Sequence, residues 1–382
     1  MDFSYSEEQQ LLRKEIIRFA HSELNEGVRE RDRDQTFSRE LFLKCGEMGI
    51  QGLPVDEKYG GVGADPITTA MALEAFGYGC HDGGLVFAVC AHLLACVVPI
   101  WLHGTEDQKA RLLPELCTGR KIAVNGMTEP QSGSDAFSMS TRAVPDGDGF
   151  RISGTKTFSS NGPVADLAVI YALTDPEKGY YGGVTAFLVE SGTSGFSSGQ
   201  KFEKMGLRSC VIGELVLEDV WVGPEAILGE PGGGTTIFTQ SMEWERICLV
   251  ATHVGKMQWL LEKAVEYART RTAFNQKIGK FQAVSHRIAD MKIRLEAARW
   301  LTYRSASRLG KARDVGLDAS LTKVFVSDAL VASAEDAMRI LGGYGFMTEY
   351  DVERVLRDAL AGPLYSGTND IQRNIIAGWL GL

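Results

Sequence analysis

A polar turn near the end of the chain carries residue types that can do chemistry. It interrupts an otherwise helical stretch and reads Tyr365-Ser366-Gly367-Thr368-Asn369-Asp370. Hydroxyls and backbone N–H groups at the start of a new helix attract phosphates and polarisable carbonyl groups. The turn is therefore a candidate binding site, although a serine cannot act as a base at neutral pH without a partner.

A candidate base lies on the long helix expected after residue 234. Phe238, Met242, Glu245 and Leu249 follow at spacings of four, three and four, so Glu245 interrupts an apolar stripe that should face the interior. A carboxyl group there is paired, neutral or functional, and desolvation would raise its pKa toward the value that a base needs at neutral pH. The alternative is a structural ion pair with Arg246 or another helix; we favour the catalytic interpretation.

The composition sets the class of protein that must position these residues. With 382 residues, 44% hydrophobic and 23% charged, the chain is expected to form two or three globular domains. A formal net charge of −9 disfavours nucleic-acid partners. No run of about eighteen uncharged apolar residues stands out, so no membrane span is expected. The N-terminus resembles neither a secretory signal nor a transit peptide, so we expect a cytoplasmic protein.

The cysteines, histidines and glycines point to no metal or dinucleotide site. Seven cysteines are scattered without a C-x-x-C pair, and six histidines show no ligand spacing, so we expect neither disulfides nor a metal. Gly60, Gly61 and Gly63 lack the G-x-G-x-x-G spacing and follow no clear strand. We expect a loop that needs glycine's backbone freedom there.

The first third of the chain, residues 1–120, is expected to be a helical domain. Ser6-Glu7-Glu8-Gln9 forms a capping box that begins a helix, and a second helix is expected near 38–48, after the charged stretch VRERDRDQ. Residues 66–98 are largely apolar and predict buried helices separated by a turn. Thr105 is expected to cap a further helix that ends before Gly119.

The rest of the chain changes first to strands and then back to helices. In residues 121–230, short segments such as GFRISGTKTFSSN and DLAVIYALTD predict an antiparallel sheet or barrel, with a hairpin turn at Pro145 to Gly149. Residues 231–382 predict a C-terminal helical bundle. Its helices are expected near 235–271, 281–309, 317–341, around 353 and from Thr368 onward.

Six motifs, in order, resemble those of one known family. They are MTEPQSGSD (127–135), GTKTFSSNG (154–162), KMGLRSC (204–210), ARTRTAF (268–274), ILGGYGF (340–346) and YSGTNDIQR (365–373). Together they resemble the acyl-CoA dehydrogenase family over nearly the whole chain. The resemblance implies an α+β multidomain fold with a helical domain, a β-domain and a four-helix bundle. It also implies bound FAD and, usually, a homotetramer.

The resemblance implies which residues hold the FAD. Thr128 would lie beside the flavin pyrimidine and Ser134 near the pyrophosphate. Phe158 stands where relatives place a tryptophan against the isoalloxazine, and Ser160 where a threonine bonds flavin N5. Two further residues resemble those that reach the FAD of a neighbouring subunit, Arg271 and Phe274. The full implied set is Met127, Thr128, Ser134, Phe158, Ser160, Arg271, Phe274, Gln282, Arg339, Gly342, Gly343, Thr368 and Asp370.

Two of these residues also have simpler interpretations when the sequence is considered alone. The segment 132–134 would be an ordinary polar turn. Arg271 would be a solvated cation near a helix C-terminus, where the helix dipole favours it.

Ser366 stands where many family members carry the glutamate that removes an α-proton from a thioester. In the isovaleryl-CoA dehydrogenase branch the base lies instead in a Glu-Arg pair on the long helix, which Glu245-Arg246 matches. The resemblance thus implies that Glu245 takes the α-proton while hydride passes to flavin N5. Glu243, Arg246, Ser366 and Gly367 would surround the substrate.

The substrate carrier is less well determined by the sequence. MEWER (242–246) also resembles the branch that oxidises aminoacyl groups on peptidyl carrier proteins, such as L-prolyl carrier protein dehydrogenases of secondary metabolism. We favour this substrate over a short- or branched-chain acyl-CoA of catabolism, although both present a phosphopantetheine arm. Electron-transfer flavoprotein or oxygen would accept the electrons. A flavin-dependent monooxygenase on the same fold is a third interpretation.

Overall fold

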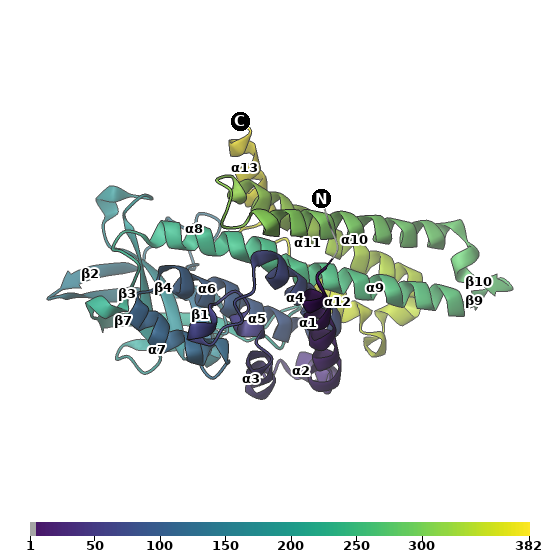
Figure 1. Ribbon diagram of the computed structural model, residues 1–382, viewed down its shortest axis with the longest axis horizontal. Helices are drawn as coiled ribbons and strands as arrows, with labels where there is room; N and C mark the ends of the chain where they lie inside the picture. The colour runs from purple at the N-terminus through teal and green to yellow at the C-terminus, as the bar shows by residue number, and fades with distance from the viewer. Residues whose placement is uncertain (1–4) are drawn as a thin grey trace.

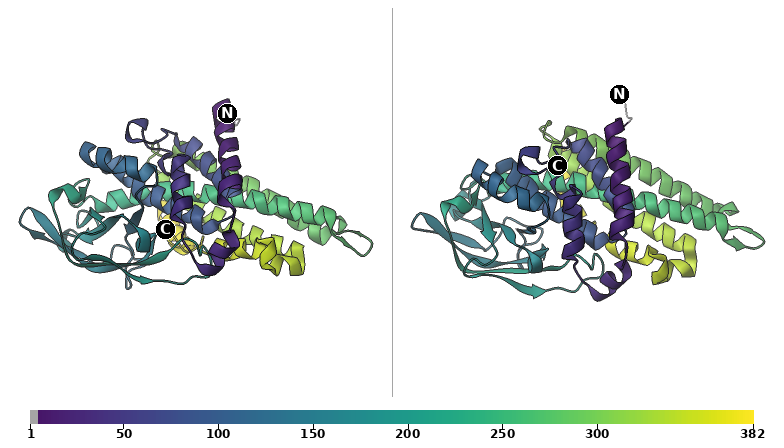
Figure 2. Two further views of the ribbon diagram at one scale, coloured as in Figure 1. Left: turned by 90° about the horizontal axis from the view of Figure 1, so that it is seen from below. Right: turned by 60° about the horizontal axis from the view of Figure 1, so that its bottom comes forward.

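The computed structural model describes residues 5–382; the first four residues of the expected N-terminal domain, 1–120, lie outside the described part. Three groups of elements follow one another along the chain. A β-sheet forms one end of the molecule, long helices extend to the opposite end, and the N-terminal helices pack between them along one side (Figures 1 and 2). The α+β architecture expected from the sequence is confirmed.

The N-terminal helices begin at the caps that the sequence predicts. Ser6 and Gln9 form the capping box of α1, and Thr105 with Gln108 forms that of α7. The charged stretch after residue 27 was expected to precede the second helix, but it forms a helix of its own, α2, whose Arg31 pairs with buried Asp82. The helices are α1 (Glu7–Phe19), α2 (Val28–Asp34), α3 (Arg39–Glu47), α4 (Pro66–Gly79), α5 (Gly83–His92), α6 (Val98–His103) and α7 (Glu106–Cys117).

One apolar run in this region corrects an expectation. The helical stretch Gly83–His103, which comprises α5, a π-turn (Leu93–Val97) and α6, is long and apolar enough to cross a membrane by length and composition. The expectation that no such run exists was therefore wrong. In the structure 78% of its most apolar window is buried inside the chain, as in the core helix of a globular protein.

The middle of the chain forms an eight-stranded sheet in the order β6-β7-β3-β2-β4-β5-β8, with β1 paired to β4. The predicted hairpin is confirmed, because Asp146 pairs with Gly149. The sheet is mixed rather than antiparallel throughout, since β1 and β4 run parallel. The strands are β1 (Ala123–Gly126), β2 (Arg142–Asp146), β3 (Gly149–Ser160), β4 (Leu167–Leu173), β5 (Val184–Glu190), β6 (Phe196–Lys201), β7 (Ile212–Val222) and β8 (Ile227–Leu228).

The long helices after residue 233 match the predicted bundle. They are α8 (Gly234–Trp244), a π-turn (Glu245–Leu249), α9 (Val250–Thr270), α10 (Gln282–Arg308), α11 (Val315–Leu341), α12 (Val352–Ala359) and α13 (Asn369–Trp379). A short hairpin of β9 (Thr272–Ala273) and β10 (Gln276–Lys277) joins α9 to α10 at the tip of the bundle (Figure 1).

Close contact between α4 and α9 fixes the long helix against the N-terminal helices. A Cβ atom on Gly77 would lie 2.2 Å from the carbonyl oxygen of Thr252, and one on Gly255 would lie 2.1 Å from that of Glu74. Only glycine permits two backbones to approach so closely. The π-turn that carries Glu245 is therefore held in register with the N-terminal core.

Candidate active site

Glu245 is the first residue of the π-turn and is only 8% exposed. The apolar stripe predicted that Glu245 lies in the interior, and the structure places it there. Its Oε1 accepts a hydrogen bond from the hydroxyl of Ser366, so the turn at 365–370 and the long helix meet at this carboxyl group. A π-turn places an extra residue in one helical turn and is frequent at functional sites.

Burial and the groups around Glu245 act in opposite directions on its carboxyl. Burial raises the pKa of the Glu245 carboxyl, and the Ser366 hydroxyl, Arg246 and Lys323 oppose that rise. The Nε–H of Arg246 donates to the carbonyl oxygen of Ser366 at 2.9 Å, not to the carboxylate of Glu245. Burial also raises the pKa of the half-buried Glu243.

Three helices hold the turn that faces Glu245. Ser366 (φ 56°) and Gly367 (φ 79°) are both left-handed, which is unfavourable for serine. The carbonyl oxygen of Ser366 accepts from Arg246 and, at 3.2 Å, from Gln372 of α13. The carbonyl oxygen of Gly367 accepts from Lys323 of α11 at 2.9 Å. Together these donors stabilise the unusual backbone conformation.

Lys323 is a site residue that the sequence analysis did not identify. It is fully buried, and its Nζ also donates to Asn369 Oδ1 at 2.7 Å. Burial lowers the pKa of Lys323 to about 7. The available signal was a lysine inside the apolar stretch LTKVFV of a helix that was expected to be buried.

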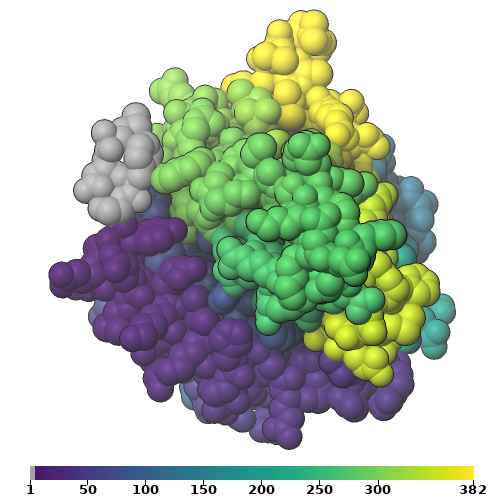
Figure 3. Space-filling model, turned by 90° about the vertical axis from the view of Figure 1, so that its right-hand side faces the viewer, coloured from purple at the N-terminus to yellow at the C-terminus, as the bar shows by residue number. Residues whose placement is uncertain are grey.

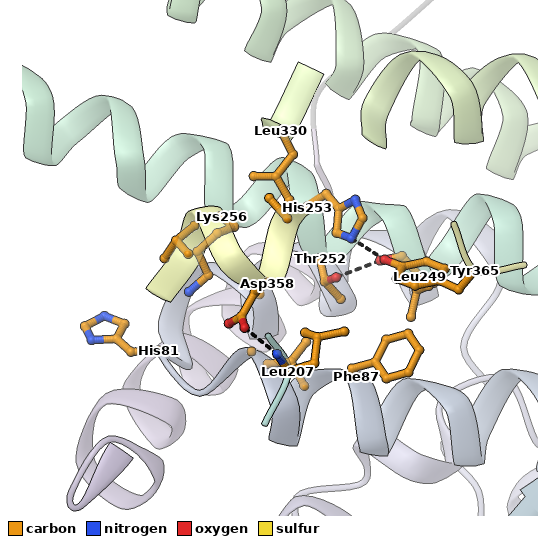
Figure 4. Close-up of a pocket in the computed structure, with 15 residues that line it drawn as sticks. His81, Phe87, Leu207, Leu249, Thr252, His253, Lys256, Leu330, Asp358 and Tyr365 are labelled. Carbon is orange, nitrogen blue, oxygen red and sulfur yellow. Dashed lines mark hydrogen bonds between the residues drawn. The ribbon is translucent and has the colours of Figure 1, made fainter. Parts of the chain in front are cut away.

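Tyr365, which directly precedes Ser366, lines a small cavity (Figure 4). Its hydroxyl bonds His253 Nε2 at 2.6 Å, and its ring lies 4.8 Å from that of Phe87. The cavity, of about 50 Å³, is also lined by Leu249, Lys256 and Asp358. Burial lowers the pKa of His253 to about 3, so its imidazole is neutral near pH 7.

The sheet presents a second group of candidate residues. Thr128 accepts from the N–H of Thr157 at 2.8 Å through its carbonyl oxygen, beside buried Met127. Phe158 has φ 52° and is 63% exposed. It lies at a register irregularity of β3, one residue before Ser159 and two before Ser160. Ser134 lies exposed in the loop between β1 and β2.

A buried ion pair that was not predicted from the sequence supports this part of the sheet. Lys156 Nζ donates to Glu129 Oε1 at 2.8 Å, and both side chains have no exposed surface. Burial alone would raise the pKa of Glu129, but Lys156 and the N–H of Ser140 outweigh it and lower that pKa. The two residues lie inside the quoted motifs MTEP and GTKT, which was the available signal.

A further group of predicted cofactor residues, Arg271, Phe274, Gly342 and Gly343, lies at the far tip of the bundle, away from the sheet (Figure 1). A shallow groove there is lined by Tyr267, Arg271, Gly342, Gly343, Tyr344 and Met347. The face in Figure 3 looks onto this tip, where the end of α9 meets the segment after α11. Phe274 is 91% exposed at the hairpin. A single chain therefore does not bring both groups of predicted cofactor residues together.

Four other predicted cofactor residues lie at the ends or on the exposed sides of helices in the bundle. Thr368 caps α13 by accepting from the N–H of Ile371 at 3.2 Å. Asp370 points outward and pairs with Arg373 at 3.4 Å. The exposed Gln282 begins α10, and Arg339 pairs with Glu335 on the exposed side of α11. Among residues 5–382 no cluster of side chains could hold a metal ion.

Comparison with known proteins gives consistent matches along the chain. The family models matched are the acyl-CoA dehydrogenase N-terminal domain (residues 6–120), middle domain (125–220) and C-terminal domain (232–381). An L-prolyl-[peptidyl-carrier protein] dehydrogenase from Pseudomonas fluorescens is 41% identical over 99% of both chains. One from Serratia sp. is 39% identical over 100% of this chain and 99% of its own. A short-chain acyl-CoA dehydrogenase from Megasphaera elsdenii is 37% identical over 100% of both.

Solved structures agree with these relatives. The prolyl acyl carrier protein oxidase AnaB superposes with a TM-score of 0.97 at 43% identity, covering 99% of this chain and 100% of its own. PigA, solved with FAD and proline, has a TM-score of 0.97 at 39% identity and covers 100% of both chains.

Proposed function

The chain belongs to the acyl-CoA dehydrogenase family, and we propose that it oxidises an L-prolyl thioester carried on the phosphopantetheine of a peptidyl carrier protein. The observation that carries the proposal is the buried Glu245 carboxyl against the turn at Ser366. Full-length similarity to L-prolyl carrier protein dehydrogenases supports the substrate.

The protein is an FAD-dependent oxidoreductase, like relatives solved with FAD, and its own residues fit the cofactor. Phe158 exposes an aromatic face from a left-handed backbone near the C-terminal end of β3, as a flavin ring would require. The buried Ser159 hydroxyl has no partner among the described residues. When bound, FAD supplies the two-electron acceptor. Thr128, Ser134, Phe158 and Ser160 would hold the flavin side from the sheet.

Glu245 supplies the base that the reaction needs. Its carboxylate takes the proton from the α-carbon of the thioester, which the carbonyl acidifies. A pKa raised by burial makes the carboxylate more basic than an exposed glutamate. Because protonation removes the base, kcat/KM should fall as the pH falls through the raised pKa of Glu245. Ser366, smaller than the glutamate of other members, leaves room for a ring on the acyl group.

A second candidate substrate is a short- or branched-chain acyl-CoA. The observation that favours it is the 37% identity to the short-chain acyl-CoA dehydrogenase of Megasphaera elsdenii. The same base and the same phosphopantetheine arm would serve both substrates. Only a comparison of substrates separates the two functions.

The base assignment is tested by Glu245→Gln, with Glu243→Gln as the matched control two residues away. We expect Glu245→Gln to keep FAD, judged by its visible spectrum, and to lose about 10²- to 10⁴-fold in kcat, the contribution of a general base, because an amide cannot take the proton. Glu243→Gln should retain kcat and change KM alone, because Glu243 is expected to contact the substrate rather than the reacting carbon. Near wild-type rates in Glu245→Gln would refute the base.

The substrate is tested by comparing prolyl-carrier protein with butyryl-CoA and isovaleryl-CoA. We expect kcat/KM to be highest for the prolyl-carrier protein. Activity on the free CoA esters alone would contradict the proposed substrate and favour the second candidate.

Assembly and partners complete the proposal. We propose a homotetramer in the cytoplasm, with electrons passed to oxygen or to electron-transfer flavoprotein. The exposed bundle tip supports assembly, because Arg271 and Phe274 lie at the opposite end of the chain from the sheet residues and could complete the cofactor site only of another copy. The division at residues 1–120, 121–230 and 231–382 stays a prediction.

A further inference from the structure

We propose that Ser366 is a positioning residue, whose hydroxyl fixes Oε1 of Glu245 and leaves Oε2 to take the substrate proton. The inference rests on the proposed function, because it assigns a role beside the base. Ser366 stands where many relatives carry the base itself. Here its hydroxyl contacts the carboxyl group of the proposed base, Glu245.

The backbone of the turn is built to aim this hydroxyl. Ser366 has φ 56°, a conformation that a non-glycine residue adopts only at a cost. Its carbonyl oxygen is fixed from one side by Arg246 at 2.9 Å and from another by Gln372 at 3.2 Å. The next carbonyl oxygen is fixed by Lys323 at 2.9 Å. The hydroxyl is thus directed at Glu245 by a backbone that cannot rotate freely.

The groups that pack around Glu245 leave the hydroxyl a distinct role. Cations come from its own turn and from α11, as Arg246 and Lys323, and the acid Glu243 lies two residues before it. Burial raises the pKa values of the remaining titratable neighbours, which stay neutral near pH 7. These neighbours are Cys90, Cys96, Tyr171 and Tyr365. The Ser366 hydroxyl is a neutral group that bonds the carboxylate directly.

A hydroxyl that donates to a carboxylate favours its ionised form. Without it, burial should raise the pKa of Glu245 further. The carboxylate would then exist only at higher pH and would be free to rotate, so that neither oxygen is held toward the α-carbon. Both effects follow from one bond and can be measured separately, as a shifted pH profile and a lowered plateau rate.

The test compares Ser366→Ala with Ser366→Gly in the FAD-loaded enzyme. Both remove the hydroxyl; glycine also relieves the left-handed backbone, so it keeps the test valid if the alanine variant folds poorly. We expect the acid limb of kcat/KM to move up by about one to two pH units in both variants. Infrared difference spectra, with Glu245→Gln as the reference, should show the carboxyl titrating higher by the same amount.

Ser320→Ala is the matched control. Ser320 donates to Gln372 Oε1 at 2.9 Å, so its loss loosens the support of the turn without touching Glu245. The acid limb should stay where the wild type has it. An unshifted limb in both Ser366 variants, or an equal shift in Ser320→Ala, overturns the inference. If Glu245→Gln is inactive in that case, the base assignment still stands; if Glu245→Gln turns over normally, the proposed function itself fails.

Discussion

Two local irregularities of the backbone meet at the Glu245 carboxyl: the π-turn that begins at Glu245 and the left-handed conformation of Ser366. The spacing from Phe238 to Glu245 runs through α8, where the helix is regular, so the buried position could be predicted from periodicity. The irregularity starts only at Glu245 itself. The hydrogen bond from Ser366 to Glu245 could not be predicted. It depends on a left-handed φ angle at residue 366, a conformation that glycine or asparagine adopts more readily than serine.

Phe87 should limit the length of acyl group that the site accepts. Its ring packs against that of Tyr365, both rings line the cavity in Figure 4, and Tyr365 directly precedes Ser366. Phe87→Ala should join the cavity to the site and raise the relative kcat/KM for a hexanoyl thioester of pantetheine over a butyryl one by about tenfold, the value of one or two buried methylenes.

The control for this prediction is Leu330→Ala. Leu330 lines the same cavity, so its truncation enlarges the space without removing the aromatic wall. The preference for chain length should stay unchanged in this variant. Equal preferences in Phe87→Ala and the wild type would show that the wall does not limit the acyl group.

At the scale of elements, the strands were predictable where β-branched and aromatic residues dominate. The polar strand β6 was not, because FSSGQK is exposed almost throughout and lacks a buried face. The parallel pairing of β1 with β4 also escaped prediction. The pairing joins strands about forty residues apart, and the loop that follows β1 is held by a long-range ion pair, neither of which local propensity reveals.

The Glu129–Lys156 pair should be essential to this loop. Lys156→Met leaves a buried, unpaired carboxylate, which costs about 3–5 kcal/mol of folding free energy. Glu129 also accepts from the N–H groups of Ser140 and Thr141 at 2.6 and 3.0 Å, so its position fixes the loop. Urea unfolding at neutral pH should show the loss.

The double variant Glu129→Gln/Lys156→Met should recover much of that stability, because it removes both charges and keeps one acceptor oxygen. A single Lys156→Met variant as stable as the wild type would mean that the pair contributes little. A double variant less stable than the single one would contradict the charge explanation.

At the scale of the whole molecule, the order of helical domain, sheet and bundle was predictable, because each third of the chain has its own periodicity. The site was predictable only in part. Residues of one motif, such as 365–370, stay together in space. The motifs at 154–162 and 268–274, by contrast, lie at opposite ends of the folded molecule (Figure 1). Periodicity contains no information on that distance.

This separation leads to a prediction about assembly. If Arg271 holds the FAD of a neighbouring copy, Arg271→Glu should weaken FAD binding by about 10- to 100-fold, the value of a hydrogen bond to a charged group. Arg271 is accessible for this role: its guanidinium lies 5.7 Å from the Tyr344 ring centroid in an open groove.

Arg269→Glu, at another exposed arginine of the same tip, is the matched control and should bind FAD normally. FAD fluorescence titration with sedimentation velocity separates lost affinity from lost assembly. An Arg271→Glu enzyme that stays assembled and binds FAD as the wild type does would show that the tip takes no part in the cofactor site.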